Sequence, residues 1–402
     1  MAPIPRYRQQ TRPAVLSAGF RPFFLLAALW ASLVIPISIL FLTGLMHLPT
    51  AFPPSAWHAH EMAFGYGGAV VAGFLLTAIP NWTGRLPLQG GPLAFLFLLW
   101  LSGRLAVMFS SVIGLRVTAA LDLAFPGAFL LVVAREIVAG RNWRNLPMVA
   151  ALALLFIGNA LTHFEALGMA PLAGVGNRIG VATLLMLVSL VGGRIVPSFT
   201  RNWLVKQSSM AATPAPFDFL DRAALLMTAI ALALWSVSRE MWLTSWLEIG
   251  ASGALAARLQ RWRGEETLSE PLLWVLHLGY GWLPFGLLLL GLNGFVAFLP
   301  QTTALHALTV GAIGTMTLAV MTRASLGHTG RPLVAGPRTT TIYVLITLAA
   351  LLRLCVPLFG GHYVVGLSLA AAAWCAAFGS FAMFYFRPLT QPRVGAEGAP
   401  PI

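Results

Sequence analysis

The sequence predicts an all-α polytopic membrane protein with about twelve transmembrane helices. Hydrophobic residues make up 58% of the 402 residues and charged residues only 9%, whereas soluble domains carry roughly 25% charged residues. The mean hydropathy is +0.81. Apolar runs that are long enough to cross a bilayer, about 20 residues each, recur along the whole chain.

Twelve candidate spans follow from these apolar runs. They cover approximately 20–44, 60–80, 91–111, 116–137, 146–165, 177–197, 221–238, 240–259, 271–292, 304–322, 338–358 and 364–386. Only Arg239 and Glu240 separate the seventh span from the eighth. A tight helical hairpin and a single broken span both explain that spacing.

The distribution of basic residues orients these spans. With the N-terminus inside, twenty basic residues fall on the cytoplasmic side, and four fall on the other side: Arg116, Arg178, Arg239 and Arg353. This bias is the usual signature of orientation in the inner membrane, so we expect both termini in the cytoplasm. The net charge of +13 therefore reflects orientation, and we expect no binding of nucleic acid.

The predicted domain organisation is simple. We expect a cytoplasmic N-terminal segment over 1–19, a single transmembrane domain over 20–386 and a flexible cytoplasmic tail over 387–402. A cytoplasmic loop at about 198–220 would connect two halves of six helices each. The basic start followed by a long apolar run predicts an uncleaved signal anchor.

A histidine pattern occurs twice. Each copy has glycines five and eight residues after the histidine and a Thr-Gly-Arg triplet 23 residues after it. The positions are His60, Gly65, Gly68 and 83–85 in the first copy, and His306, Gly311, Gly314 and 329–331 in the second. Two similar helices would each present an imidazole near the outer face of the membrane. Because imidazole binds metals and haem iron, the repeat indicates a cofactor.

The glycines of this repeat have two explanations, and both stay open. Without side chains at Gly65, Gly68, Gly311 and Gly314, a haem ring could lie against the helices while His60 and His306 bind its iron. Alternatively, the glycines allow close packing between membrane helices. The two histidines could bind one haem together or serve separate centres.

Other polar residues in or near the predicted spans are candidates for cofactor chemistry. His277 lies deeper than the repeated histidines and is a candidate ligand of a second haem. His58 and His60 point about 200° apart on a regular helix, so we consider His58, together with His163, as copper ligands. Asp122 is a candidate partner of Arg104 or a member of a proton relay.

Glu61, next to His60, is the candidate catalytic residue. It could orient a ligand or accept a proton. An equally simple explanation is that its charge stabilises the N-terminus of the helix.

Several longer motifs resemble the NnrS family. They are Gly-Phe-Arg-Pro-Phe-Phe at 19–24, Trp-His-Ala-His-Glu-Met at 57–62, Pro-Asn-Trp-Thr-Gly-Arg at 80–85, Leu-His-Ala-Leu-Thr-Val-Gly at 305–311, and the run from Met to Pro at 321–332. The resemblance covers essentially the whole chain. It implies a multi-pass protein of the bacterial inner membrane that contains haem and copper and takes part in nitric oxide metabolism and tolerance of nitrosative stress, often alongside denitrification.

Three functional hypotheses follow from the sequence and the resemblance. In the first, the protein binds or converts nitric oxide, or protects cellular iron from it. An enzyme of this kind would be a haem–copper oxidoreductase that takes electrons from quinol or a redox protein. Because a CxxCH motif is absent from the sequence, the haem would be haem b or a similar non-covalent haem. The alternatives are a secondary transporter, whose helix number and middle loop match, and a non-catalytic protein that handles haem or metal.

Overall fold

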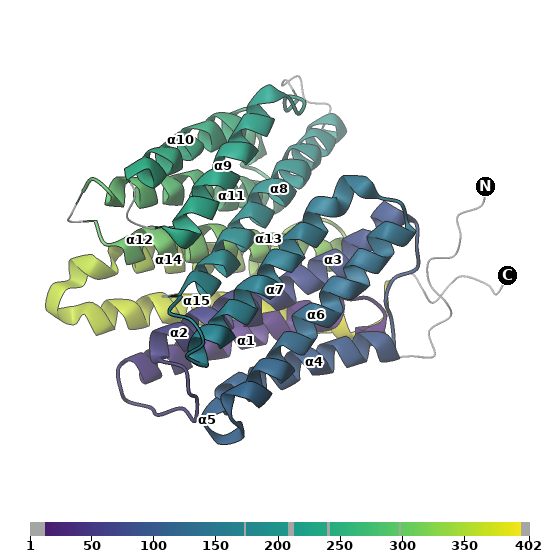
Figure 1. Ribbon diagram of the computed structural model, residues 1–402. Coiled ribbons are helices and arrows are strands. Elements are labelled where there is room, and N and C mark those ends of the chain that lie inside the picture. The colour runs from purple at the N-terminus through teal and green to yellow at the C-terminus, as the bar shows by residue number, and fades with distance from the viewer. Residues whose placement is uncertain (1–12, 173, 208–212, 239–241, 297–298, 395–402) are drawn as a thin grey trace. The chain divides into compact units, whose positions relative to one another are not determined.

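The computed structural model describes residues 13–172, 174–207, 213–238, 242–296 and 299–394. Within these ranges every regular element is a helix (Figure 1). The α-helices are α1 (Phe20–Leu42), α2 (Pro54–His60), α3 (Gly67–Thr83), α4 (Gly91–Met108), α5 (Ser110–Ile113), α6 (Leu115–Ala139), α7 (Leu146–Ala166), α8 (Val175–Lys206), α9 (Phe219–Val237), α10 (Trp242–Gln260), α11 (Pro271–Asn293), α12 (Gln301–His306), α13 (Thr315–His328), α14 (Pro337–Cys355) and α15 (Tyr363–Thr390). This confirms the all-α class.

Ten helical stretches of the described chain are long and apolar enough to cross a membrane. A helix forms at each of the twelve predicted positions, but three of these positions are counted differently. The last two predicted spans lie in one helical stretch, Pro337–Thr390, which Gly360 interrupts with a φ of +52°. Helix α10 is absent from the ten because Glu248 and Arg258 make it less apolar. The number twelve and the cytoplasmic termini stay predictions.

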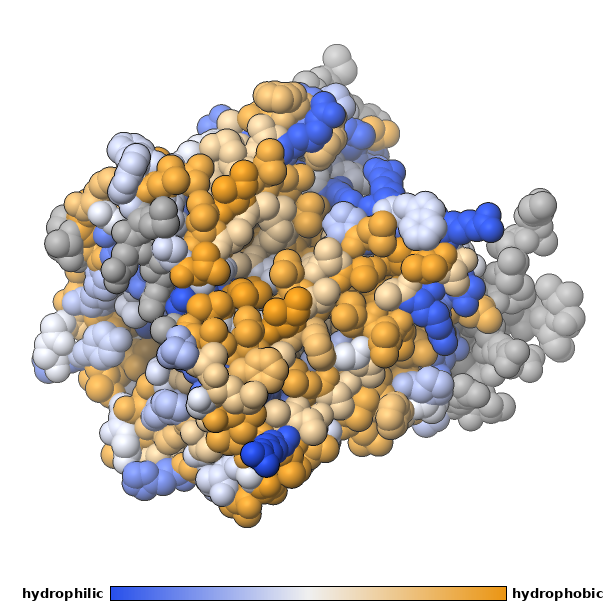
Figure 2. Space-filling model, in the orientation of Figure 1, coloured by the Kyte–Doolittle hydropathy of each residue, from blue (hydrophilic) through white to orange (hydrophobic). Residues whose placement is uncertain are grey.

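The surface of these helices is apolar. Large hydrophobic side chains are exposed on several long helices, among them Leu131 on α6 at 71% and Leu226 on α9 at 62%. Orange, hydrophobic residues dominate the face shown in Figure 2. In water such a surface would drive aggregation. It fits a multi-pass protein whose helices face lipid.

The chain divides into two compact units. The first unit comprises Met1–Gly180, Met321–Pro332 and Phe381–Ile402, and the second comprises Val181–Val320 and Leu333–Ser380. Helix α8 continues to Lys206, so the connection expected at 198–220 begins later than the sequence suggests. Parts of the expected N-terminal segment (1–12), loop (208–212) and tail (395–402) lie outside the described residues.

The histidine repeat of the sequence is also a repeat of local structure. His60 ends the short helix α2, which follows Pro53, and His306 ends the short helix α12, which follows Pro300. A π-helix comes next in both copies, Glu61–Tyr66 in the first and Ala307–Gly314 in the second, before α3 and α13 continue. This confirms the prediction of two similar helices. Such π-helical turns are rare and occur frequently at functional sites.

Close helix contacts in the first unit bring polar residues together. At Gly103 of α4, an added Cβ atom would lie 2.7 Å from Oδ1 of Asp122 and 3.1 Å from its Cα atom on α6. At Gly158 of α7, a Cβ atom would lie 2.9 Å from the carbonyl oxygen of Gly176 on α8. Small residues let membrane helices approach closely, and Gly103 thereby places Arg104 beside Asp122.

A buried ion pair joins the helices of the second unit. Arg258 of α10 is 1% exposed, and its Nε donates to Asp221 of α9 at 2.7 Å. Its Nη1 donates to the hydroxyl of Tyr280 on α11 at 2.9 Å and to the carbonyl of Ser189 on α8 at 3.1 Å. Four helices therefore meet at one guanidinium.

Replacing Arg258 by Gln should strongly destabilise the protein. The change leaves the buried carboxylate of Asp221 with only the longer ion pair to Arg261 at 3.5 Å, and breaking a buried ion pair costs about 3–5 kcal/mol. Arg222→Gln is the matched control, because it removes the same charge from an exposed position. Denaturation in detergent micelles measures both variants, and equal stability of the two would contradict a structural role for the Arg258 pair.

Candidate metal centre

A cluster of six polar side chains lies inside the first unit. All are at most 2% exposed, and they are His60, Glu61, Arg104, Asp122, Asn159 and His163. Buried ionisable groups in a membrane protein are costly and are usually functional. The cluster is therefore the leading candidate for the functional site.

The helix ends position this cluster. Arg104 lies four residues before the end of α4, Asp122 lies seven residues after the start of α6, and His163 lies three residues before the end of α7. These ends are on one side of the unit because consecutive helices alternate in direction. At 1.5 Å per residue, the cluster lies about 5–10 Å inside that side. We expect that side to be periplasmic.

Two histidines and one carboxylate form the centre of the cluster. Oδ2 of Asp122 lies 3.2 Å from Nε2 of His60 and 2.9 Å from Nε2 of His163. One potential ligand atom from each of the three residues lies within 4.8 Å of the others. Imidazole nitrogen and carboxylate oxygen are ligands of copper, zinc, iron and nickel. The three residues therefore have the chemistry and the spacing of a metal site.

Arg104 connects the two carboxylates of the cluster. Its Nη1 donates to Oε1 of Glu61 at 2.7 Å, and its Nη2 donates to Oδ1 of Asp122. The ion pair with Asp122 is the partnership that the sequence suggested. The guanidinium thus holds two anionic groups from different helices in an apolar interior.

Glu61 fixes the orientation of His60. Its Oε2 accepts from Nε1 of Trp30 at 2.9 Å, and its Oε1 lies 3.1 Å from Nδ1 of His60. A carboxylate on one ring nitrogen sets the tautomer and leaves the other nitrogen to face a metal. Nε2 of His60 faces Oδ1 of Asn159 at 2.9 Å as well as Asp122.

The charges of the cluster do not balance, and one further cation would neutralise them. With neutral imidazoles, the carboxylates of Glu61 and Asp122 outweigh the single guanidinium of Arg104 by one negative charge. Both ring nitrogens of His60 face oxygen acceptors. A second proton on His60 would satisfy this arrangement, and so would a proton on Nδ1 with a metal at Nε2.

Aromatic rings close the cluster from water. The ring of Phe52 lies 5.6 Å from that of His60 and 5.8 Å from that of His163, and Phe64 lies 5.3 Å from His60. Nδ1 of His163 is buried without a hydrogen-bond partner among the described residues. Such an orphaned polar atom is costly, so the site is more than a well-satisfied structural network.

The other predicted histidine ligands lie outside this cluster. Nδ1 of His58 pairs with the hydroxyl of Ser38 at 3.0 Å. In the second unit, Nε2 of His277 pairs with the hydroxyl of Thr200 at 2.9 Å, and Nδ1 of His306 lies 2.6 Å from the carbonyl oxygen of Thr302. Of the proposed copper ligands, the structure brings only His163 into the cluster, where it meets His60.

The repeated glycines have different neighbours in the two units. A Cβ atom at Gly65 would lie 2.7 Å from Nη1 of Arg104, whereas one at Gly68 would lie 3.7 Å from the ring of Phe125. Gly311 packs against the indole of Trp282 and Gly314 against that of Trp374, with a first contact at 2.6 Å and 2.7 Å. Three of the four glycines thus make space for neighbouring side chains, as the packing explanation expects.

The remaining members of the cluster could be predicted only in part from the sequence. Asp122 stood out as an intramembrane carboxylate, although only as a partner of Arg104 or a proton relay. Asn159 was missed, yet it lies four residues before His163, which places both side chains on one face of α7. Trp30 had no signal, because an aromatic residue near the middle of a span is ordinary.

The neighbours of the repeated glycines predict that Gly65→Ala disrupts the cluster and Gly68→Ala does not. A methyl group at Gly65 collides with Arg104, Glu61 and Trp30, and overpacking of this kind costs about 1–3 kcal/mol. The same methyl group at Gly68 meets only ordinary contacts. Thermal unfolding in detergent checks this pair, and a Gly68→Ala variant at least as unstable as Gly65→Ala would contradict it.

Comparison with known proteins agrees with this architecture. The family model described as NnrS protein matches residues 14–393, which include the whole cluster and both copies of the histidine repeat. A search of curated protein sequences gives no match. Because the family model covers nearly the entire chain, the protein belongs to the NnrS family.

Proposed function

We propose that the protein is a metal-containing membrane protein that acts on nitric oxide, by binding it, by redox conversion or by protecting cellular iron. Membership of the NnrS family supports the link to nitric oxide. The single observation that carries the metal site is the buried group of His60, Asp122 and His163. We place this activity in the bacterial inner membrane.

The residues of the cluster fit a copper ion. His60, His163 and Asp122 would be its ligands, in place of the pair of His58 and His163 that the sequence suggested. Two imidazoles and a carboxylate form a donor set that copper(II) accepts. A cation at this position would also balance the excess negative charge of the two carboxylates.

Each neighbouring residue has a role in such a site. Bound copper would supply a one-electron redox couple and a coordination position for a small ligand. Glu61 keeps the proton of His60 on Nδ1, and Arg104 holds both carboxylates in place. The rings of Phe52 and Phe64 exclude water. Glu61 is thus a positioning residue, and in an enzyme it would also be the candidate for a catalytic proton transfer.

Haem does not fit around His60 in this structure. The imidazole is fully buried, both of its nitrogens face protein oxygens, and aromatic rings surround it. His306 is the better candidate for a haem b ligand. Its Nδ1 lies 2.6 Å from a carbonyl oxygen, so the proton belongs on Nδ1 and the lone pair on Nε2. Gly311 and Gly314 pack against the indole rings of Trp282 and Trp374.

The transporter hypothesis is weaker. The charged cluster lies about 5–10 Å inside one side of the first unit, whereas carrier sites favour the middle of the bilayer. If the protein is instead an oxidoreductase, it would need quinol or a redox protein as its electron donor.

The purified protein should contain copper that depends on His163. We expect His163→Gln to lose most of its copper, because its amide can still bond to Asp122 but binds copper poorly. His58→Gln is the matched control, because His58 lies outside the cluster. Elemental analysis together with visible spectra measures copper and haem in each variant.

The outcomes of this experiment are distinct. Copper retained in His163→Gln would contradict the ligand assignment. A wild-type protein without any transition metal would leave His60 as a buried cation and contradict the metal centre. Loss of the haem absorption band in His306→Gln, with copper unchanged, would support a separate haem ligand in the second unit.

Replacing Glu61 by Gln should weaken copper binding without removing a ligand. Loss of such a partner of a ligand histidine typically lowers metal affinity about 10–100-fold. The matched control is Glu165→Gln on α7, whose carboxylate accepts from the amide of Gly174 outside the cluster. Competition with a copper chelator measures both affinities, and equal affinities would show that Glu61 does not orient His60.

A further inference from the structure

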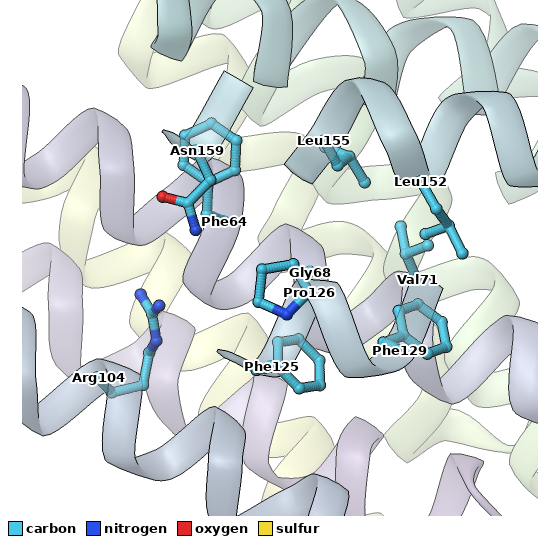
Figure 3. A pocket seen from close by; sticks show the side chains of 10 residues that line it. All are labelled: Phe64, Gly68, Val71, Arg104, Phe125, Pro126, Phe129, Leu152, Leu155 and Asn159. Carbon is cyan, nitrogen blue, oxygen red and sulfur yellow. The ribbon is translucent and has the colours of Figure 1, made fainter. Parts of the chain in front are cut away.

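A narrow cleft in the first unit leads toward the cluster. Its walls come from α3, α4, α6 and α7 and from the π-helix before α3. The lining residues are Phe64, Gly68, Val71, Arg104, Phe125, Pro126, Phe129, Leu152, Leu155 and Asn159. Figure 3 shows Arg104 and Asn159 at one end and the side chains of Val71, Phe129 and Leu152 at the other. Apart from Arg104 and Asn159, the lining side chains are apolar.

The small volume of the cleft limits the size of the molecule that it can hold. Its cavity volume is about 20 Å³. A cavity needs at least about 10–15 Å³ on the same measure to hold one water molecule. The cleft therefore admits a molecule of two or three atoms, whereas a porphyrin or a quinone ring is far too large.

The polar end of the cleft reaches the residues that we assign to the metal. Asn159 lines it and lies 2.9 Å from Nε2 of His60 through its Oδ1, while its Nδ2 donates to Asp122 at 2.8 Å. Arg104 lines it as well and is ion-paired with Asp122. A molecule in the cleft is thus separated from the proposed ligands by one side chain.

The partly exposed residues of the cleft lie at the depth of the bilayer interior. Gly68 and Pro126 are less buried than the other lining residues. Gly68 lies fourteen residues from the start of α2, and Pro126 lies eleven residues from the start of α6. At 1.5 Å per residue, both are about 16–21 Å from that side. On α7, Leu154 and Ile157 flank the buried Leu155 and are each 47% exposed, as expected of a face toward lipid.

We propose that this cleft, which opens at Gly68 and Pro126, admits a small uncharged gas from the bilayer to the His60–Asp122–His163 site. Nitric oxide is diatomic, uncharged and more soluble in hydrocarbon than in water, so it concentrates where the cleft opens. Hydrated ions such as nitrite are excluded, because the apolar walls cannot replace their water. The assignment of nitric oxide rests on the proposed function; the route for a small apolar gas rests on the cleft itself.

Gly68→Leu tests the route, because a side chain at Gly68 would fill the opening. We expect nitric oxide association and dissociation with the protein in lipid nanodiscs to slow by the same factor, about tenfold or more. The equilibrium affinity should stay unchanged, because a blocked route alters both rates alike. A purely structural defect would change the affinity or the metal content instead.

Two matched controls accompany this variant. Gly68→Ala adds a methyl group at an ordinary distance from Phe125 and should bind nitric oxide at nearly the wild-type rate. Gly253→Leu makes the same substitution on α10, where an added Cβ atom meets nothing within 4 Å. Unchanged rates in Gly68→Leu, or equal slowing in Gly253→Leu, would overturn the route.

Xenon binding tests the cleft without any metal or nitric oxide. Xenon NMR of the protein in nanodiscs should detect a bound signal in the wild type and in Gly253→Leu, and lose it in Gly68→Leu. Absence of xenon binding in the wild type would overturn the inference. Xenon binding in a protein that binds no nitric oxide would retain the route for apolar gases and contradict the proposed function alone.

Discussion

The first unit depends on one guanidinium that holds two carboxylates together. Glu61 and Asp122 come from segments far apart in the sequence and would repel one another in an apolar interior. Arg104 donates to both of them, and the glycine before it lets α4 and α6 approach closely enough for this contact. The carboxylates then orient His60 and His163. A buried charge network of this kind is costly unless every member has a partner, which explains why its geometry is so tightly specified.

The two copies of the histidine repeat share one local structure, but their histidines have different neighbours. Each copy has a proline-initiated short helix, a terminal histidine and a π-helix. In the first unit the π-helix carries Glu61, and His60 enters a charged cluster. In the second unit Ala307 replaces the glutamate, and His306 bonds to a backbone carbonyl. Under the proposed function the two copies therefore serve different centres, copper in the first and haem in the second, although the sequence allowed a single shared haem.

Composition predicted the helical membrane fold well, because length and apolarity alone determine which segments can cross a bilayer. The repeat predicted two similar helices, and both are present. The site was harder to predict, since its members come from four helical segments and their packing is set by tertiary contacts. Asp122 was recognisable as an unusual intramembrane carboxylate, and its pairing with Arg104 was expected. Its contact with His60 and His163 could not be predicted from the sequence, because these residues lie on different helices and no local spacing relates them. The π-helices were also missed, as nothing in the glycine spacing distinguishes them from α-helix.

The most direct test of the metal centre counts the imidazole ligands of bound copper by pulsed electron paramagnetic resonance of the oxidised protein. The proposed site predicts nitrogen couplings from two histidines in the wild type and from one in His163→Gln reloaded with copper, with His58→Gln identical to the wild type. Couplings that persist unchanged in His163→Gln, or that change in His58→Gln, would contradict the assignment of copper to His60, Asp122 and His163.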